Sequence, residues 1–190
     1  AITLSGRIVT DPAGTAALPS YAATFIWMET ASGSVWHGRH SASDKSPAGE
    51  LLVDGLLPGA YHLRAQGARW RLKSVVIAGA DYTHKPIDLA SGASYSDVVV
   101  TITNATTVVS GPVSTDSGGP PQTAAVIAFP VEREQWVNYG IYPTRIASVR
   151  TSSTGQFRLT TLPAGAYYLI ALPLAKADAW IAPDFFQRAQ

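Results

Sequence analysis

Apolar and polar residues alternate with a period of two over most of the chain, which predicts short, half-buried β-strands. The pattern is clearest at 155–171, where Phe157 and Leu159 alternate with polar neighbours. Pro163 and Gly165 then interrupt the alternation, because proline fixes its own φ and glycine can adopt the positive φ of a tight turn. The alternation resumes after these residues, so the stretch predicts a strand, a turn and a second strand.

Six positions of this stretch recur earlier in the chain at one constant offset, which indicates an internal duplication. Gly49, Leu56, Gly59, Tyr61, Leu63 and Ala65 correspond to Gly155, Leu162, Gly165, Tyr167, Leu169 and Ala171. The segment 4–11 likewise echoes 109–116, and Leu4-Ser5-Gly6 corresponds to Val109-Ser110-Gly111. Since about 100 residues suit a small sandwich, we expect an all-β chain of two tandem β-sandwich domains. The domains are placed at 1–104 and 105–190, with the boundary in Asn104-Ala105-Thr106.

Further strand-like runs separated by Gly, Pro and Ser turns fill both copies. They lie at 2–10, 22–30, 35–40, 72–77, 86–89 and 97–103 in the first copy, and at 124–129 and 146–151 in the second. No long amphipathic helix is predicted. Only Pro183–Gln190 predicts the start of a short helix, since proline suits the first helical turn and Asp184 suits its positive end.

The second copy ends differently from the first, because the residues after Ala171 do not have the pattern of a strand. We therefore expect the second sandwich to be one strand short. Two explanations stay open. The chain is cut short or ends in an unordered tail, or a partner supplies the strand to the unpaired sheet edge.

Composition narrows the functional classes. Charged residues make up 14% of the chain, below the usual ~25%, and the net charge is +1. The basic face that nucleic-acid binding needs is therefore missing. The chain has no cysteine, which excludes disulfides, thiol catalysis and thiolate zinc sites. No run approaches the ~20 apolar residues of a membrane span, and no signal peptide precedes the strand-like start at Ala1. Either a leader has been removed or the sequence begins inside a longer protein.

Catalytic and metal-binding patterns are weak throughout. No Gly-x-Ser-x-Gly motif occurs, and the carboxylates are dispersed without an evident acid–base pair. His37 and His40 are too few for a closed metal site, which takes about four ligands. The run Asp116-Ser117-Gly118-Gly119 fits a plain turn better than a calcium loop. We therefore expect no catalytic residue, no metal and no cofactor.

The aromatic residues are the best candidates for ligand binding. Two exposed tryptophans near Asn or Asp could stack against sugar rings, and the glycan-binding candidates are Trp136, Asn138, Tyr139, Trp27 and Trp36. The alternative is that these rings are packed inside the sandwiches, as large aromatics mostly are.

Several of these motifs together resemble the carboxypeptidase regulatory-like domains. The similar elements are Ser-Gly-x-Val, the strand Ala-Val-Ile-Ala-Phe-Pro at 125–130, Gly-x-Phe-x-Leu at 155–159 and Leu-Pro-x-Gly-x-Tyr-x-Leu at 162–169. The resemblance covers both halves of the chain. It implies transthyretin-like (prealbumin-like, Cna-B-like) sandwiches in an extracellular or periplasmic bacterial protein, and a module that is not an enzyme.

The resulting hypothesis is a non-catalytic structural or adhesive module of an exported bacterial surface protein. It would serve as a spacer or as a filament subunit, completed by a strand from a neighbouring subunit. The alternative is a carbohydrate-binding module that uses the aromatic residues. No nucleic-acid partner and no membrane span are expected.

Overall fold

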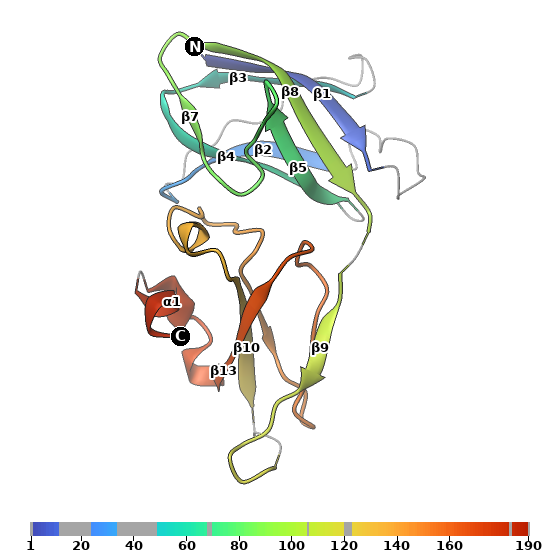
Figure 1. Cartoon of the computed structure of the whole chain (residues 1–190), viewed down its shortest axis with the longest axis vertical. Coiled ribbons are helices and arrows are strands. Elements are labelled where there is room, and N and C mark those ends of the chain that lie inside the picture. The colour runs from blue at the N-terminus through green and yellow to red at the C-terminus, as the bar shows by residue number, and fades with distance from the viewer. Residues whose placement is uncertain are drawn as a thin grey trace. The chain divides into compact units, whose positions relative to one another are not determined.

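A computed structural model of the chain describes residues 2–11, 24–33, 49–67, 70–105, 107–119, 123–182 and 184–189. The chain is mostly β-strand and divides into two compact units (Figure 1). The first unit is Ala1–Ala105 together with the short segment Asn138–Ile141. The second unit is Thr106–Val137 and Tyr142–Gln190.

The first unit is a sandwich made from one long sheet path. Its strands are β1 (Ile2–Thr10), β2 (Thr24–Thr30), β3 (Glu50–Leu56), β4 (Gly59–Gly67), β5 (Arg71–Ile77), β6 (Ala80–Asp81), β7 (Ile87–Leu89) and β8 (Ser94–Thr103). The order is β2-β4-β5-β8-β1-β3, with β6 beside β5 and β7 beside β4. A single residue pair, Gln66 with Arg71, joins β4 to β5. The path therefore turns over at this point, and β2 and β4 face β1 and β3 across the core.

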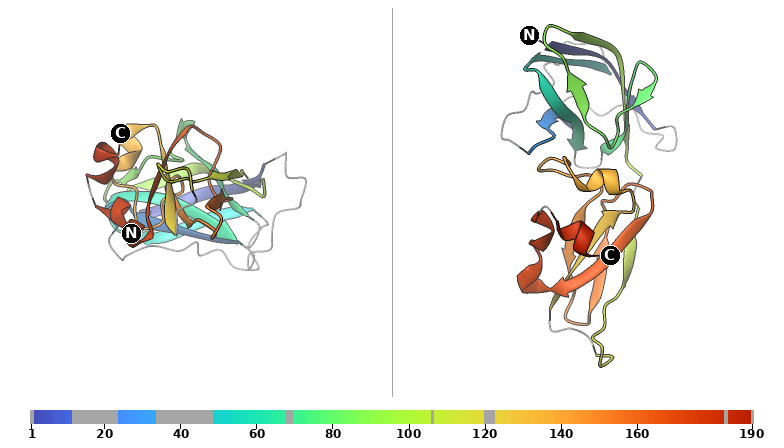
Figure 2. Two further views of the ribbon diagram at one scale, coloured as in Figure 1. Left: turned by 90° about the horizontal axis from the view of Figure 1, so that it is seen from below. Right: turned by 60° about the vertical axis from the view of Figure 1, so that its left-hand side comes forward.

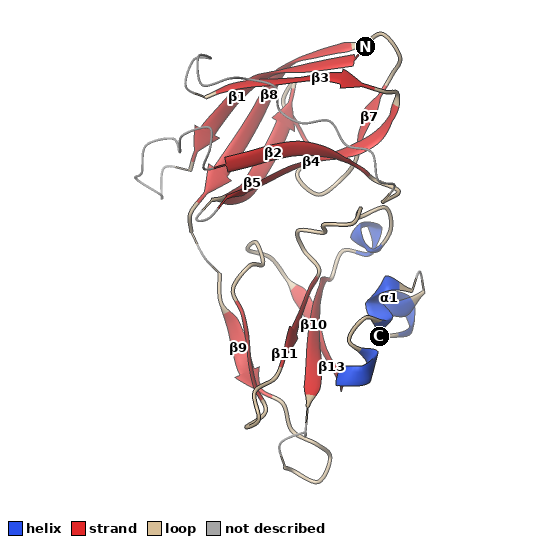
Figure 3. Cartoon of the chain, turned by 180° about the vertical axis from the view of Figure 1, so that it is seen from behind, coloured by secondary structure: helices blue, strands red, loops and turns tan. Residues whose placement is uncertain are grey.

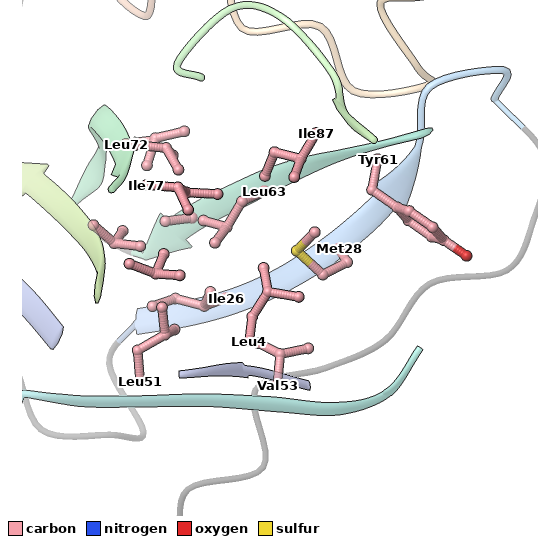
Figure 4. Close-up of a cluster of buried hydrophobic side chains, with 14 of the residues drawn as sticks. Leu4, Ile26, Met28, Leu51, Val53, Tyr61, Leu63, Leu72, Ile77 and Ile87 are labelled. Carbon is pink, nitrogen blue, oxygen red and sulfur yellow. The ribbon is translucent and has the colours of Figure 1, made fainter. Parts of the chain in front are cut away.

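Alternate residues of each long strand fill that core, as the period-two pattern predicts. Leu4 of β1 and Val53 of β3 face Met28 of β2 and Leu63 of β4 (Figure 4). The strand β8 contributes three fully buried residues, Val98, Val100 and Ile102. It lies parallel to β1 on one side and antiparallel to β5 on the other, so it closes the sandwich.

The second unit has fewer strands, arranged in two small sheets. The strands are β9 (Val109–Pro112), β10 (Ala124–Pro130), β11 (Ala147–Arg150), β12 (Gln156–Leu159) and β13 (Tyr167–Pro173). One sheet has the order β11-β10-β13, and the other pairs β12 with β9. Ala128, Leu159 and Leu162 form the buried centre, with Val109, Val149, Phe157 and Tyr167 packed partly against it.

Short helices cover the opposite face of β10. They are η2 (Arg133–Trp136), η3 (Leu174–Lys176), η4 (Ala179–Ile181) and α1 (Phe185–Arg188). The Phe186 ring lies 4.9 Å from the Phe129 ring, and the Trp136 ring lies 5.8 Å from it. Helix α1, red in Figures 1 and 2 and blue in Figure 3, therefore packs on the outer side of β10. The short helix predicted at 183–190 is present at Phe185–Arg188.

Arg145 holds the long connection after β10 against the start of β13. Its buried guanidinium donates to Glu132, at 2.9 Å, and to Gln135 and the backbone oxygen of Ala166. It also lies over the Tyr167 ring, 4.9 Å from the ring centre. A Cβ atom at Gly165 would come within 2.5 Å of the Arg145 Nη2 atom, so a side chain at this position would displace the guanidinium from its hydrogen bonds.

The second unit lacks more of the sandwich than the sequence indicates. The duplication aligns β1–β4 with β9, β10, β12 and β13. Among the described residues, however, no strand corresponds to β5, β6, β7 or β8. The chain instead leaves β13 directly into η3. The expectation of one missing strand therefore understates the difference, since β5 and β8 both have no counterpart there.

Candidate functional site

Two of the five glycan-binding candidates, Trp27 and Trp136, are buried. Trp27 is only 8% exposed and Trp136 only 5%. The Trp136 Nε1 atom donates to the Pro130 backbone oxygen at 2.8 Å, which fixes the ring inside the fold. Trp36, like His37 and His40, lies outside the described residues. The burial of two rings matches the alternative in which the tryptophans serve packing, and glycan binding stays a prediction.

Asn138 and Tyr139 take part in a buried polar cluster of the first unit. His62 Nε2 donates to the Asn138 backbone oxygen at 2.6 Å, and Arg64 donates to the Tyr139 backbone oxygen at 2.7 Å. The Ile141 backbone N–H donates to a carboxylate oxygen of Glu29. The backbone of 138–141, rather than its side chains, therefore makes these contacts.

Glu29 and Arg64 form an ion pair on the outer face of β2 and β4. Arg64 Nε and Glu29 Oε2 are 2.8 Å apart, and both side chains are less than 5% exposed. Burial is the main cause that lowers the pKa of neighbouring His62, and the positive charge of Arg64 adds to it. His62 is therefore neutral at about pH 7. Alternation along β4 puts His62 on the face opposite Tyr61 and Leu63, and this face is buried as well.

This cluster has the character of a structural ion pair rather than of a reaction centre. Its two charges neutralise each other, and Arg64 Nη2 and the second carboxylate oxygen of Glu29 are bonded to backbone atoms. Over the part of the chain that the structure describes, no group of three His, Asp or Glu side chains could hold a metal ion. None of the described helices is long and apolar enough to cross a membrane.

The inner face of β13 is the most unusual surface of the second unit. Leu169 points toward this face and is 47% exposed, whereas its counterpart Leu63 is 2% exposed in the first unit. Ala171 is exposed where Ala65 is buried, and Tyr167 is only partly buried where Tyr61 is buried. The same apolar pattern is thus covered in one copy and open in the other.

The exposure is explained by the strands that have no counterpart among the described residues of the second unit. In the first unit β8 lies beside β1, and β5 and β7 lie beside β4. The corresponding edges of β9 and β13 pair with no strand in the described part of the chain. An unpaired edge next to an open apolar face can accept an added strand, because backbone hydrogen bonds and side-chain burial are both available there.

Gly111 marks one of these edges. At its counterpart Gly6, a Cβ atom would lie 1.9 Å from the backbone oxygen of Val98 in β8. A Cβ atom at Gly111 would meet only the Phe157 ring, at an ordinary 3.5 Å. The close approach of a neighbouring backbone therefore requires glycine at position 6, while no such contact requires it at position 111.

Comparisons with known proteins identify no family for the chain. No family model and no curated protein matches it. Three solved structures align with 90% of it: a streptococcal ancillary pilin (15% identity, TM-score 0.34), the Bacillus anthracis TIE protein (11%, 0.30) and the RrgB pilus backbone of Streptococcus pneumoniae (10%, 0.27). The chain spans 53%, 27% and 54% of their lengths, respectively. At such scores these similarities do not define a function, and the resemblance to carboxypeptidase regulatory-like domains stays a prediction.

Sequence reasoning missed Leu169 and Gly111 as surface residues. Both residues belong to the duplication, but their counterparts Leu63 and Gly6 have different surroundings. The available signal was the missing strand pattern after Ala171, which removes the covering of the positions that face it.

Proposed function

We propose that the chain is a non-catalytic structural module of an exported bacterial surface protein. Its sandwich domains, at 1–104 and 105–190, serve as a spacer or assembly unit. In this proposal the second domain is an acceptor that a strand from a neighbouring polypeptide completes. The observation that carries the proposal is the open inner face of β13, centred on Leu169.

The energetic reason is the burial of apolar surface. Covering a leucine side chain fully is worth about 1.5–3 kcal/mol, and Leu169 is roughly half covered within its own unit. Covering the remainder would therefore contribute about 1 kcal/mol at this residue alone. Ala171 and Tyr167 on the same face add to this, and the new backbone hydrogen bonds contribute about 1 kcal/mol each.

The remaining features are consistent with a module of this kind. The described residues bring no acid–base pair and no metal ligands together in a pocket, and the buried charges are neutralised in place. A surface low in charge and rich in Ser and Thr is common among exported β-proteins, which supports the extracellular assignment.

Cross-linking through single cysteines tests the proposal directly, because the chain has none of its own. Leu169→Cys carrying a photoreactive group should form an adduct with a neighbouring polypeptide in the cells that produce the protein. Mass spectrometry should map the adduct to one extended segment with alternating apolar residues. The matched control is Leu57→Cys, because Leu57 is 59% exposed in the turn between β3 and β4. An absent adduct at position 169, or the same adducts at both positions, would refute the proposal.

A further inference from the structure

We infer that the acceptor edge is the free edge of β9, and that the donated strand runs parallel to β9 with inward-facing β-branched apolar residues. The donor has the chemistry of β8, and the proposed function assigns it to a neighbouring polypeptide. This inference rests on the proposed function, and it adds the edge, the direction and the side-chain pattern of the strand.

The first argument is the glycine at position 111. Glycine weakens a strand by about 0.5–1 kcal/mol relative to alanine, so it is costly where no contact requires it. In strands it often marks a site where another backbone approaches closely. Gly6 shows this role within the same chain, since β8 occupies the space that a side chain would need. Gly111 leaves the same space free beside β9.

The second argument gives the direction and side-chain pattern of the donor. The strand β8 runs parallel to β1, and Gly6 pairs with Val98, Ile8 with Val100 and Thr10 with Ile102. These three β8 residues point into the core of the first unit. A donor in the same register would bring alternate apolar side chains over the centre of the second unit.

The residues around the free edge of β9 favour a donor strand whose inward-facing side chains are uncharged. The residues that would meet inward side chains are Val109, Val149, Leu159 and Leu169, which are all apolar. Burying a charge against them would be unfavourable without a partner for it. The donor is therefore a segment with β-branched residues at alternate positions, and its charged residues lie outside that face.

The proline at position 112 makes the β9 strand of a second copy of the chain a poor partner for this edge. The N–H groups of Ile8 and Val113 point toward β3 and β12, where they donate to Gly49 and Gly155. Because successive N–H groups of a strand point to opposite sides, the nitrogen of Pro112 faces the vacant edge and offers no hydrogen. Two copies paired edge to edge would each carry this defect. A donor strand that has all of its own N–H groups would lack only the one hydrogen bond that Pro112 cannot donate.

The test uses the full chain and a fluorescent synthetic peptide with the sequence of β8, Ser94–Thr103. The peptide should bind saturably and protect the amides of β9 from hydrogen exchange. A control peptide with serine in place of Val98, Val100 and Ile102 should bind at least tenfold more weakly. Gly111→Ala should reduce binding of the β8 peptide at least tenfold, because its Cβ atom occupies the space of the donor backbone. The melting temperature of Gly111→Ala should stay unchanged or rise, which separates blocked binding from misfolding.

A second variant tests the edge from the opposite direction. Pro112→Arg places the residue found at position 7 on the vacant edge and restores one N–H group. It should tighten peptide binding about fivefold, as one added hydrogen bond predicts. If Gly111→Ala binds the peptide as tightly as the unmodified chain, the acceptor edge is not β9 and the inference is wrong.

The remaining outcomes separate this inference from the proposed function. Cross-linking through Leu169 without peptide protection of β9 would leave the proposed function standing and overturn the edge and direction. If a longer form of the chain protects β9 by itself and excludes the peptide, the strand is intramolecular. The inference of a separate donor polypeptide is then wrong.

Discussion

Gly6→Ala is the sharpest stability test of the repeat. The new Cβ atom would lie 1.9 Å from the backbone oxygen of Val98 and 2.6 Å from its carbonyl carbon. Non-bonded carbon atoms pack at about 3.5–4.0 Å, so β1 and β8 would have to separate locally by roughly 1.5 Å. A stretch of that size breaks about two ladder hydrogen bonds, worth about 1 kcal/mol each. Forced overpacking adds about 1–3 kcal/mol. We therefore expect the first unit to lose about 3–5 kcal/mol of stability.

Hydrogen exchange followed by mass spectrometry measures this loss, because it resolves β1 and β8 separately from the strands of the second unit. Gly111→Ala is the matched control and should leave exchange in β9 unchanged or slightly slower. A result in which Gly6→Ala exchanges like the unmodified chain would show that β8 does not approach β1 this closely. The argument from Gly111 would then fail as well.

Three further predictions concern the buried side chains. Arg64→Met leaves the Glu29 carboxylate buried without its cation, so β2 and β4 should lose about 3–5 kcal/mol of stability as measured by hydrogen exchange. The double variant Arg64→Met/Glu29→Leu should recover most of this stability, and no recovery would contradict the pairing. Lowering the pH through about 6.5 should destabilise the same strands, because burial lowers the pKa of His62 and the unfolded chain therefore binds the proton first. In urea titrations, the free energy of unfolding of His62→Gln should depend less steeply on pH than that of the unmodified chain. An equally steep dependence would refute this assignment. Trp136→Phe keeps the aromatic packing against Phe129 but loses the bond to Pro130, so the second unit should lose about 1 kcal/mol in urea unfolding. An array on which the unmodified chain binds a glycan that this variant does not bind would instead support glycan binding.

The strands of the first unit were the most predictable part of the fold. Period-two alternation locates β1, β3, β5 and β8 because each has one face on the core. The strand β10 shows the limit of that signal, since all seven of its residues are buried and it has no polar face. The continuous apolar run predicts this strand instead, at 124–129, and the strand observed is Ala124–Pro130.

The open face of β13 was less predictable from the sequence, because its exposure depends on which strands cover it. Sequence identifies Leu169 as apolar and inward-facing, but exposure is set by the strands that cover it, and these are distant in the chain. The Glu29–Arg64 pair was missed for a related reason. Glu29 and Arg64 are 35 residues apart in sequence and meet only because β2 pairs with β4.

Both units turn at a proline and a glycine, Pro58-Gly59 in the first and Pro163-Ala164-Gly165 in the second, yet the aligned glycines meet different surroundings. A Cβ atom at Gly165 would lie 2.5 Å from the Arg145 Nη2 atom and would displace the guanidinium, whereas a Cβ atom at Gly59 would meet only the Tyr61 ring, at 3.4 Å. The duplication thus places the same residue type in two different structural environments. Mutational tolerance measured in one repeat therefore cannot be transferred to the other, and a consensus built from both would average over two unlike environments.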